Sequence, residues 1–370
     1  MTWYQPAPGA TASGVPTGYH LPLGTVTHAK RHGLSADRNT GNEKTERKII
    51  LSGMQPTGQL HLGNLEGALK NWVRLQDDYD MYCCIVDWHA LTADFNDTDG
   101  MQDRILQMAV DYLAAGLDPQ KCAIFVQSQV KEHAELHLLF SMLTPVPWLE
   151  RMPTYKDKRD NLGLDSYGFL GYPVLQAADI LLYRAHLVPV GKDQERHIIF
   201  ARDLAGRFNH LYGAEVFPMC DAKFTEFAEI PGTDGRKMSK SYGNDVRLAD
   251  SPEETEAKLK KMFTDPEKLR RNDPGRPEVC PVFKLHKAYS PAELVGEIEP
   301  TCKSGELGCV DCKKQLIAHL NDALADIRAK RAEWAARPDD VWAVLEDGAR
   351  RARERAQETM AMVRQAMNLQ

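Results

Sequence analysis

A short buried strand, followed by a glycine-rich turn and a helix, constrains this chain more than any other feature. The apolar run at residues 49–51 predicts the strand, and a helical pattern covers residues 65–75. The turn between them ends in Gly63 and Asn64. Strand, turn and helix in this order point backbone N–H groups and a positive helix end at phosphate. The turn matches neither the P-loop pattern nor the dinucleotide-binding glycine pattern.

Two short motifs, far apart in the sequence, carry a family resemblance. The first is the His-Leu-Gly-Asn run at residues 61–64, and the second is the Lys-Met-Ser-Lys-Ser run at residues 237–241. Together they resemble the paired nucleotide-binding motifs of class I aminoacyl-tRNA synthetases. The resemblance extends from residue 48 to the C-terminus. It implies an enzyme that binds ATP with Mg²⁺ and joins an amino acid to tRNA.

Strand and helix patterns alternate from residue 48 and predict an α/β fold, a parallel sheet with helices on both faces. We expect a Rossmann-like catalytic domain over residues 47–250. Helical patterns dominate later and predict an all-helical C-terminal domain over residues 251–370, which the resemblance assigns to the tRNA anticodon. Residues 1–46 lack hydrophobic periodicity and are interpreted as a disordered N-terminal extension or a misassigned start. A transit peptide is the rival interpretation, but arginines are sparse there.

The composition limits the setting and the partners. Hydrophobic residues make up 43% of the 370, and no apolar run is long enough for a membrane helix. We therefore expect a cytoplasmic enzyme with no membrane partner. The net charge of -6 gives no global attraction for RNA, so tRNA must contact a local basic surface. The candidates for that surface flank the clustered cysteines: Arg270, Arg271, Arg276, Lys303, Lys313 and Lys314.

Adenylate formation brings the α-phosphate of ATP to a carboxylate and stabilises charge that develops on pyrophosphate. His61 and Asn64 are neutral donors for the phosphate side, and Lys237 and Lys240 are the cations for pyrophosphate. Asp193 suits either a ribose hydroxyl or the start of a helix. The resemblance implies that these residues are catalytic: His61, Asn64, Lys156, Lys237, Lys240 and Ser241. It implies that these bind ATP: Gln55, Pro56, Thr57, Gly63, Asn64, Gly191, Lys192, Asp193, Lys237, Met238, Ser239, Lys240 and Ser241.

A finer resemblance comes from residues 171–181, which open with Tyr172 and Pro173 and predict an apolar helix through residue 182. This run is similar to that of the bacterial-type tryptophanyl-tRNA synthetases. Asp179 lies in an apolar stretch and suits a buried acceptor for the indole N–H. The tryptophan-binding residues implied are Gly53, Tyr172, Gln176, Asp179 and Gln194. Tyrosyl-tRNA synthetases also have an aspartate in a similar helix and are the nearest alternative. A non-catalytic RNA-binding relative or a redox sensor is the other.

Four cysteines, Cys280, Cys302, Cys309 and Cys312, form a cluster of candidate metal ligands. Four soft thiolates suit either structural zinc or a [4Fe–4S] cluster. The spacing resembles that of a subset of tryptophanyl-tRNA synthetases with a [4Fe–4S] cluster, which favours iron–sulfur. The resemblance further implies L-tryptophan and tRNA(Trp) as partners and a homodimer.

Overall fold

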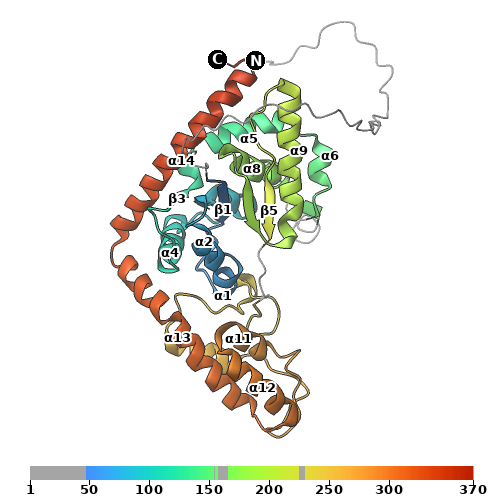
Figure 1. Ribbon diagram of the computed structural model, residues 1–370, viewed down its shortest axis with the longest axis vertical. Coiled ribbons are helices and arrows are strands. Elements are labelled where there is room, and N and C mark those ends of the chain that lie inside the picture. Colours follow the sequence, from blue (N-terminus) through green and yellow to red (C-terminus); the bar gives the residue numbers. More distant parts are fainter. Residues whose placement is uncertain (1–46, 154, 157–165, 225–229, 370) are drawn as a thin grey trace, which may run out of the picture. The chain divides into compact units, whose positions relative to one another are not determined.

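The computed structural model describes residues 47–153, 155–156, 166–224 and 230–369, without the side chains of residues 94 and 241. The predicted N-terminal extension, residues 1–46, lies outside this part. Residues 46–370 group into one compact unit. Its centre is a parallel five-stranded sheet in the order β3-β2-β1-β4-β5 (Figure 1). The strands are β1 Ile49–Met54, β2 Asp80–Ile85, β3 Cys122–Val126, β4 Leu187–Val190 and β5 Asp221–Phe224.

The sheet is buried on both faces, because neighbouring residues of a strand enter different apolar clusters. Ile50 of β1 belongs to one cluster, whereas Leu51 belongs to the other. Cys83 and Cys84 of β2 divide in the same way. Side chains that alternate between two apolar layers are expected when helices cover both faces of a parallel sheet. The predicted α/β class is therefore confirmed.

Helices connect and cover the strands. In the first half of the chain they are α1 Leu62–Asn64, the π-helix η1 Leu65–Leu69, α2 Lys70–Leu75, α3 Asp87–Asp94, α4 Met101–Ala114, the 3₁₀ turn η2 Gln127–Gln129, α5 Glu132–Leu143 and α6 Val146–Glu150. Next are α8 Tyr167–Leu182, η3 Lys192–Gln194, α9 Glu195–Tyr212 and η4 Lys240–Tyr242. The last five are α10 Pro252–Lys261, α11 Pro281–Tyr289, α12 Ala292–Ser304, α13 Cys309–Ala335 and α14 Pro338–Ala366.

One predicted helix start is wrong. The sequence favoured a helix that begins at Tyr172 and Pro173, but α8 begins at Tyr167. Ser166 caps it, since its side-chain oxygen accepts from the Phe169 N–H at 3.1 Å. Pro173 therefore lies inside the helix. Its missing N–H is tolerated in a helix that is buried along most of its length.

The C-terminal helices do not all lie apart from the sheet. α13 packs on α4, and α14 packs along the edge strand β3 and on α5 (Figure 1). The approach to β3 is closest at Gly348, where an added Cβ would lie 1.9 Å from the carbonyl oxygen of Ile124. Glycine is therefore required at that crossing. The predicted all-helical region is confirmed, and the domain boundary near residue 250 stays a prediction.

Candidate active site

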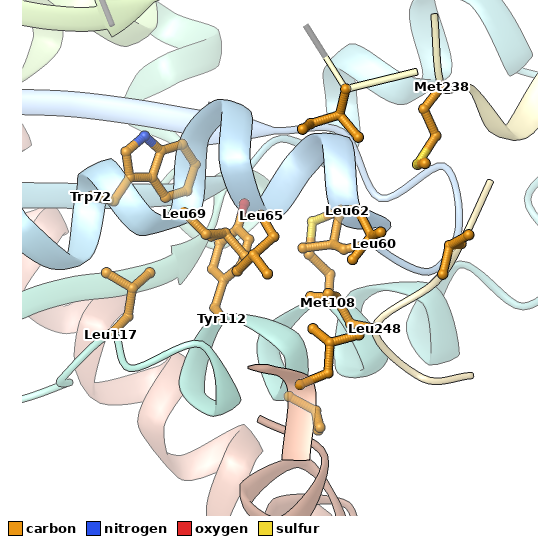
Figure 2. Packing of buried hydrophobic residues seen from close by; sticks show 14 of the residues in the cluster. Leu60, Leu62, Leu65, Leu69, Trp72, Met108, Tyr112, Leu117, Met238 and Leu248 are labelled. Atoms are coloured by element: carbon orange, nitrogen blue, oxygen red, sulfur yellow. The ribbon is translucent and has the colours of Figure 1, made fainter. Parts of the chain in front are cut away.

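The two motifs lie side by side although Gly58 and Lys240 are 182 residues apart. The Lys240 Nζ donates to the Gly58 carbonyl at 2.7 Å. The backbone N–H of Leu62 donates to Val246 at 3.0 Å, which continues the contact on the other side of the turn. Met238 is buried in the same apolar cluster as Leu62 (Figure 2). The lysine loop is thus packed onto the His61 turn through Met238, and an adenine contact for this residue stays a prediction.

A cavity of about 320 Å³ opens between the turn and the loop. Its lining includes six predicted residues: Gln55, Thr57, His61, Asn64, Ser239 and Lys240. Burial, helped by the Lys240 charge, lowers the pKa of His61 to about 4, so this imidazole is neutral near pH 7. Its Nδ1 is buried without a partner among the described residues. Burial also lowers the pKa of Lys240 to about 8. The cavity therefore presents a neutral imidazole beside a cation.

A second cavity, of about 310 Å³, lies beyond the carboxyl ends of β1 and β4. β1 and β4 are adjacent in the sheet but not consecutive in the chain, and open α/β sheets bind ligands at such positions. All five predicted tryptophan-binding residues line it: Gly53, Tyr172, Gln176, Asp179 and Gln194. Glycine is needed at position 53, because an added Cβ would lie 2.8 Å from the Cys84 carbonyl oxygen. Gln55 lines both cavities, so they adjoin.

Asp179 is the centre of a buried hydrogen-bond network. Its Oδ1 accepts from His133 Nδ1 at 2.6 Å and from Gln127 Nε2 at 2.8 Å. Its Oδ2 lies 2.9 Å from His89 Nε2. Burial alone would raise the pKa of Asp179, but His133 and His89 hold it well below its usual range. The carboxylate is therefore ionised, and His133 passes the network on to the Tyr183 hydroxyl at 2.8 Å.

Sequence reasoning missed His89, Gln127, His133 and His197 as site residues. His89 and Gln127 follow the carboxyl ends of β2 and β3, and the rule applied to residues 191–194 would have found them. His133 and His197 come from helix faces and carried no such signal. His197 Nε2 lies 2.8 Å from the Tyr172 hydroxyl and also faces the second cavity. Burial lowers the pKa of His197 to about 4, and its Nδ1 has no partner among the described residues.

Other predicted residues lie away from both cavities. Lys156, Lys192, Asp193 and Lys237 are exposed and line neither one. Pro56, Gly63 and Gly191 belong to the predicted turns but are not lining residues either. The side chain of Ser241 lies outside the described part. Each of these assignments stays a prediction.

The four cysteines gather in the helical region. Cys280 precedes α11, Cys302 lies in α12, and Cys309 and Cys312 form the first turn of α13. Burial raises the pKa of the Cys312 thiol to about 12, and the other three thiols contribute. Within the described ranges, no three cysteine, histidine or carboxylate side chains are placed to hold one metal ion. Four thiols so close together still form a soft donor set of the kind that iron–sulfur clusters use.

The basic residues around the cysteines are mostly engaged within the chain. Arg276 pairs with Asp265 at 2.7 Å, and Lys303 pairs with Glu299 at 2.7 Å. Lys313 donates to backbone carbonyls that follow α10 and end it. Their charges still lie on one local surface of an acidic chain, as the sequence predicted. None of the described helices is long and apolar enough to cross a membrane.

A parallel sheet with two adjoining cavities at its carboxyl edge, joined to a paired histidine and lysine motif, is the arrangement of a class I aminoacyl-tRNA synthetase. A family model described as tRNA synthetases class I (W and Y) matches residues 43–325. The tryptophan–tRNA ligase of Thermotoga maritima is 49% identical over 86% of this chain and 99% of its own. That of Aquifex aeolicus is 45% identical, with the same coverage.

Solved structures agree. The tryptophanyl-tRNA synthetase from Campylobacter jejuni, complexed with ADP and tryptophan, has a TM-score of 0.79 and 37% identity, covering 86% of this chain and 99% of that one. A tyrosyl-tRNA synthetase from Archaeoglobus fulgidus, at 22% identity and a TM-score of 0.60, shares the fold. The chain belongs to the bacterial tryptophanyl-tRNA synthetase family.

Proposed function

We propose that this chain is a tryptophan–tRNA ligase. It activates L-tryptophan with ATP to form tryptophanyl-adenylate and pyrophosphate, then transfers tryptophan to the 3′-terminal ribose of tRNA(Trp). The observation that carries the proposal is the pair of cavities that meet at Gln55. One has the predicted phosphate residues and the other has the predicted amino-acid residues. A carboxylate in one cavity and an α-phosphate in the other would meet at their shared wall.

We assign the phosphate chemistry to the first cavity. His61 is neutral and donates to a phosphate oxygen without adding charge, and Asn64 beside it is a second neutral donor. The Lys240 ammonium stabilises charge as it develops on pyrophosphate, and Lys237 on the same loop assists it. Mg²⁺ enters with the phosphates of ATP and neutralises part of their charge. We keep the other predicted ATP contacts: Gln55, Pro56, Thr57, Gly63, Gly191, Lys192, Asp193, Met238, Ser239 and Ser241, with Lys156 as a further catalytic candidate.

We assign amino-acid selection to the second cavity. The ionised Asp179 carboxylate is the acceptor for the indole N–H. Phenylalanine has no N–H to offer, so it would leave this buried acceptor unpaired, and such a mismatch discriminates strongly. Tyr172, Gln176 and Gln194 contact the rest of the amino acid, and Gly53 forms the cavity wall. The nearest alternative is tyrosine as the substrate.

ATP–pyrophosphate exchange tests the function directly. The purified chain should exchange pyrophosphate with tryptophan and should show little exchange with tyrosine or phenylalanine. A tRNA charging assay with tRNA(Trp) tests the second step. Faster exchange with tyrosine would assign the chain to the tyrosyl enzymes. No exchange with either amino acid would favour a non-catalytic RNA-binding or redox-sensing relative.

We further propose that Cys280, Cys302, Cys309 and Cys312 bind a [4Fe–4S] cluster. The support is a set of four thiols that come together from three helices although they are spread through the sequence. Such thiols supply soft ligands, and the cluster when bound ties those helices together. Structural zinc is the alternative, with the same ligands. Iron and sulfide analysis of anaerobically purified protein distinguishes the two.

The helical region, residues 251–370, is the proposed site of the tRNA anticodon, and residues 47–250 are the proposed catalytic domain. The local basic surface beside the cysteines supports the anticodon assignment despite the acidic total charge. Because its substrate is tRNA, we place the enzyme in the cytoplasm. Removing tRNA contacts there should raise the KM for tRNA without changing pyrophosphate exchange.

A homodimer is supported by an apolar patch on α5 and α6. Leu138 and Met142 lie one turn apart and are 55% and 68% exposed, and Val146 follows at 53%. Clustered exposed apolar side chains mark association sites, and a twofold interface can bury one patch against its copy. Sedimentation equilibrium should give a dimer, and Met142→Asp should shift it toward monomer. An unchanged mass for that variant would reject this patch as the interface.

A further inference from the structure

Asp111 on α4 is a buried carboxylate that faces two parts of the chain at once. Its side chain is fully buried. Oδ1 accepts from Arg331 Nε at 2.8 Å, and Oδ2 accepts from the Leu60 backbone N–H at 3.1 Å. The Arg331 guanidinium also donates to Gln107 and is 15% exposed. A buried carboxylate depends on such partners, because its desolvation is costly without them.

Leu60 immediately precedes His61 in the turn that lines the phosphate cavity. The Leu60 carbonyl accepts from the Leu248 N–H at 2.9 Å, so the backbone of this residue is held on both sides. On the lysine side, Lys240 holds Gly58. Leu60 is itself buried in the core, below the turn (Figure 2). Asp111 therefore fixes the one backbone N–H of the turn that points away from the lysine loop.

Arg331 comes from the helical region rather than from the sheet. It lies near the end of α13, the helix that begins with Cys309 and Cys312. At 1.5 Å per residue, roughly 33 Å of continuous helix separates that first turn from Arg331. α13 also packs on α4 along this part of its length. A rigid element thus joins the cysteine end of the molecule to the base of the phosphate cavity.

We propose that Arg331, acting through Asp111, is a positioning residue for ATP. Its guanidinium orients the Asp111 carboxylate, the carboxylate holds the Leu60 N–H, and Leu60 places His61 at the wall of the phosphate cavity. The helical region thereby sets the geometry of ATP binding without touching ATP. This inference rests on the proposed function and adds a residue that none of the ATP or tryptophan motifs includes.

The test compares Arg331→Met with Arg328→Met in the full chain. Arg328 lies one turn earlier on α13 and donates to Asn321 and Thr255, within the helical region. In pyrophosphate exchange, Arg331→Met should raise the KM for ATP about five-fold or more and leave the KM for tryptophan within about two-fold. Arg328→Met should change neither. Hydrogen exchange should also quicken in residues 58–65 of Arg331→Met alone.

Arg331→Lys covers the case in which the methionine variant does not fold. Lysine keeps the charge beside Asp111 but lacks the fork that reaches Gln107 as well. Its KM for ATP should therefore lie between those of wild type and Arg331→Met, or show a smaller rise alone. A folded variant with an unchanged KM for ATP, or with both KM values raised equally, would overturn the inference. If wild type lacks exchange with tryptophan, the proposed function fails instead, and hydrogen exchange still tests the contact.

Discussion

Replacing Asp179 with asparagine removes the charge at the centre of the tryptophan cavity and nearly preserves its shape. In the wild-type structure the carboxylate receives hydrogen bonds from His133, Gln127 and His89. A hydrogen bond to a charged group contributes about 1.5–3 kcal/mol. If the indole N–H uses this acceptor, Asp179→Asn should lower the preference for tryptophan over phenylalanine by about 10- to 150-fold.

The assay is pyrophosphate exchange with each amino acid, reported as the ratio of the two kcat/KM values. The change also leaves buried donors less well paired, so we expect a lower melting temperature as well. Tyr183→Phe is the matched control, since it removes the hydroxyl bonded to His133 and leaves Asp179 intact. It should lower stability with little change in the ratio. An Asp179→Asn enzyme that keeps the wild-type ratio would refute the assignment of the indole acceptor.

Three further predictions concern other parts of the chain. Lys240→Ala should lower the pre-steady-state rate of adenylate formation by about 100-fold or more and leave tryptophan affinity nearly unchanged, because the lysine stabilises charge that grows in the transition state. Because burial lowers the Lys240 pKa to about 8, wild-type kcat/KM for ATP should fall as pH rises through that value, and Lys240→Arg should not show this fall. Cys309→Ser should reduce the iron content and impair tRNA charging more than pyrophosphate exchange; one tightly held zinc and no iron in wild type would reject the cluster. Deleting residues 1–46 should leave the melting temperature and charging intact, and a large drop in either would show that the extension matters.

The sequence predicted the elements whose signal is local. α5 and β4 have the predicted bounds, and α13 begins with the Cys309–Cys312 turn as expected. The start of α8 was wrong because proline was given the weight of a helix start, although burial outweighs that preference here. α11 and α12 were missed for a similar reason, since α12 contains Pro300 and ends at a glycine-rich turn.

The site was predicted only as far as motifs extend. Tyr172, Gln176 and Asp179 lie at helical spacing, so their shared face followed from the sequence alone, and they do line one cavity. The partners that ionise Asp179 did not follow, because His133 and Gln127 reach it through tertiary packing. The same holds for Arg331 and Asp111, which are 220 residues apart. A buried network assembled from separate elements has no periodicity or spacing to detect.

The end of β1 has a consequence for both cavities at once. Gly53 lines the amino-acid cavity, and Gln55, two residues later, lines both. Residues at positions i and i+2 of an extended chain point to the same side, so this short segment forms a common wall. The backbone at Gly53 is pressed against Cys84 of β2 and cannot shift to admit a side chain. A change that moves this segment must therefore alter the amino-acid and phosphate cavities together, whereas changes on α8 or the lysine loop act on one of them.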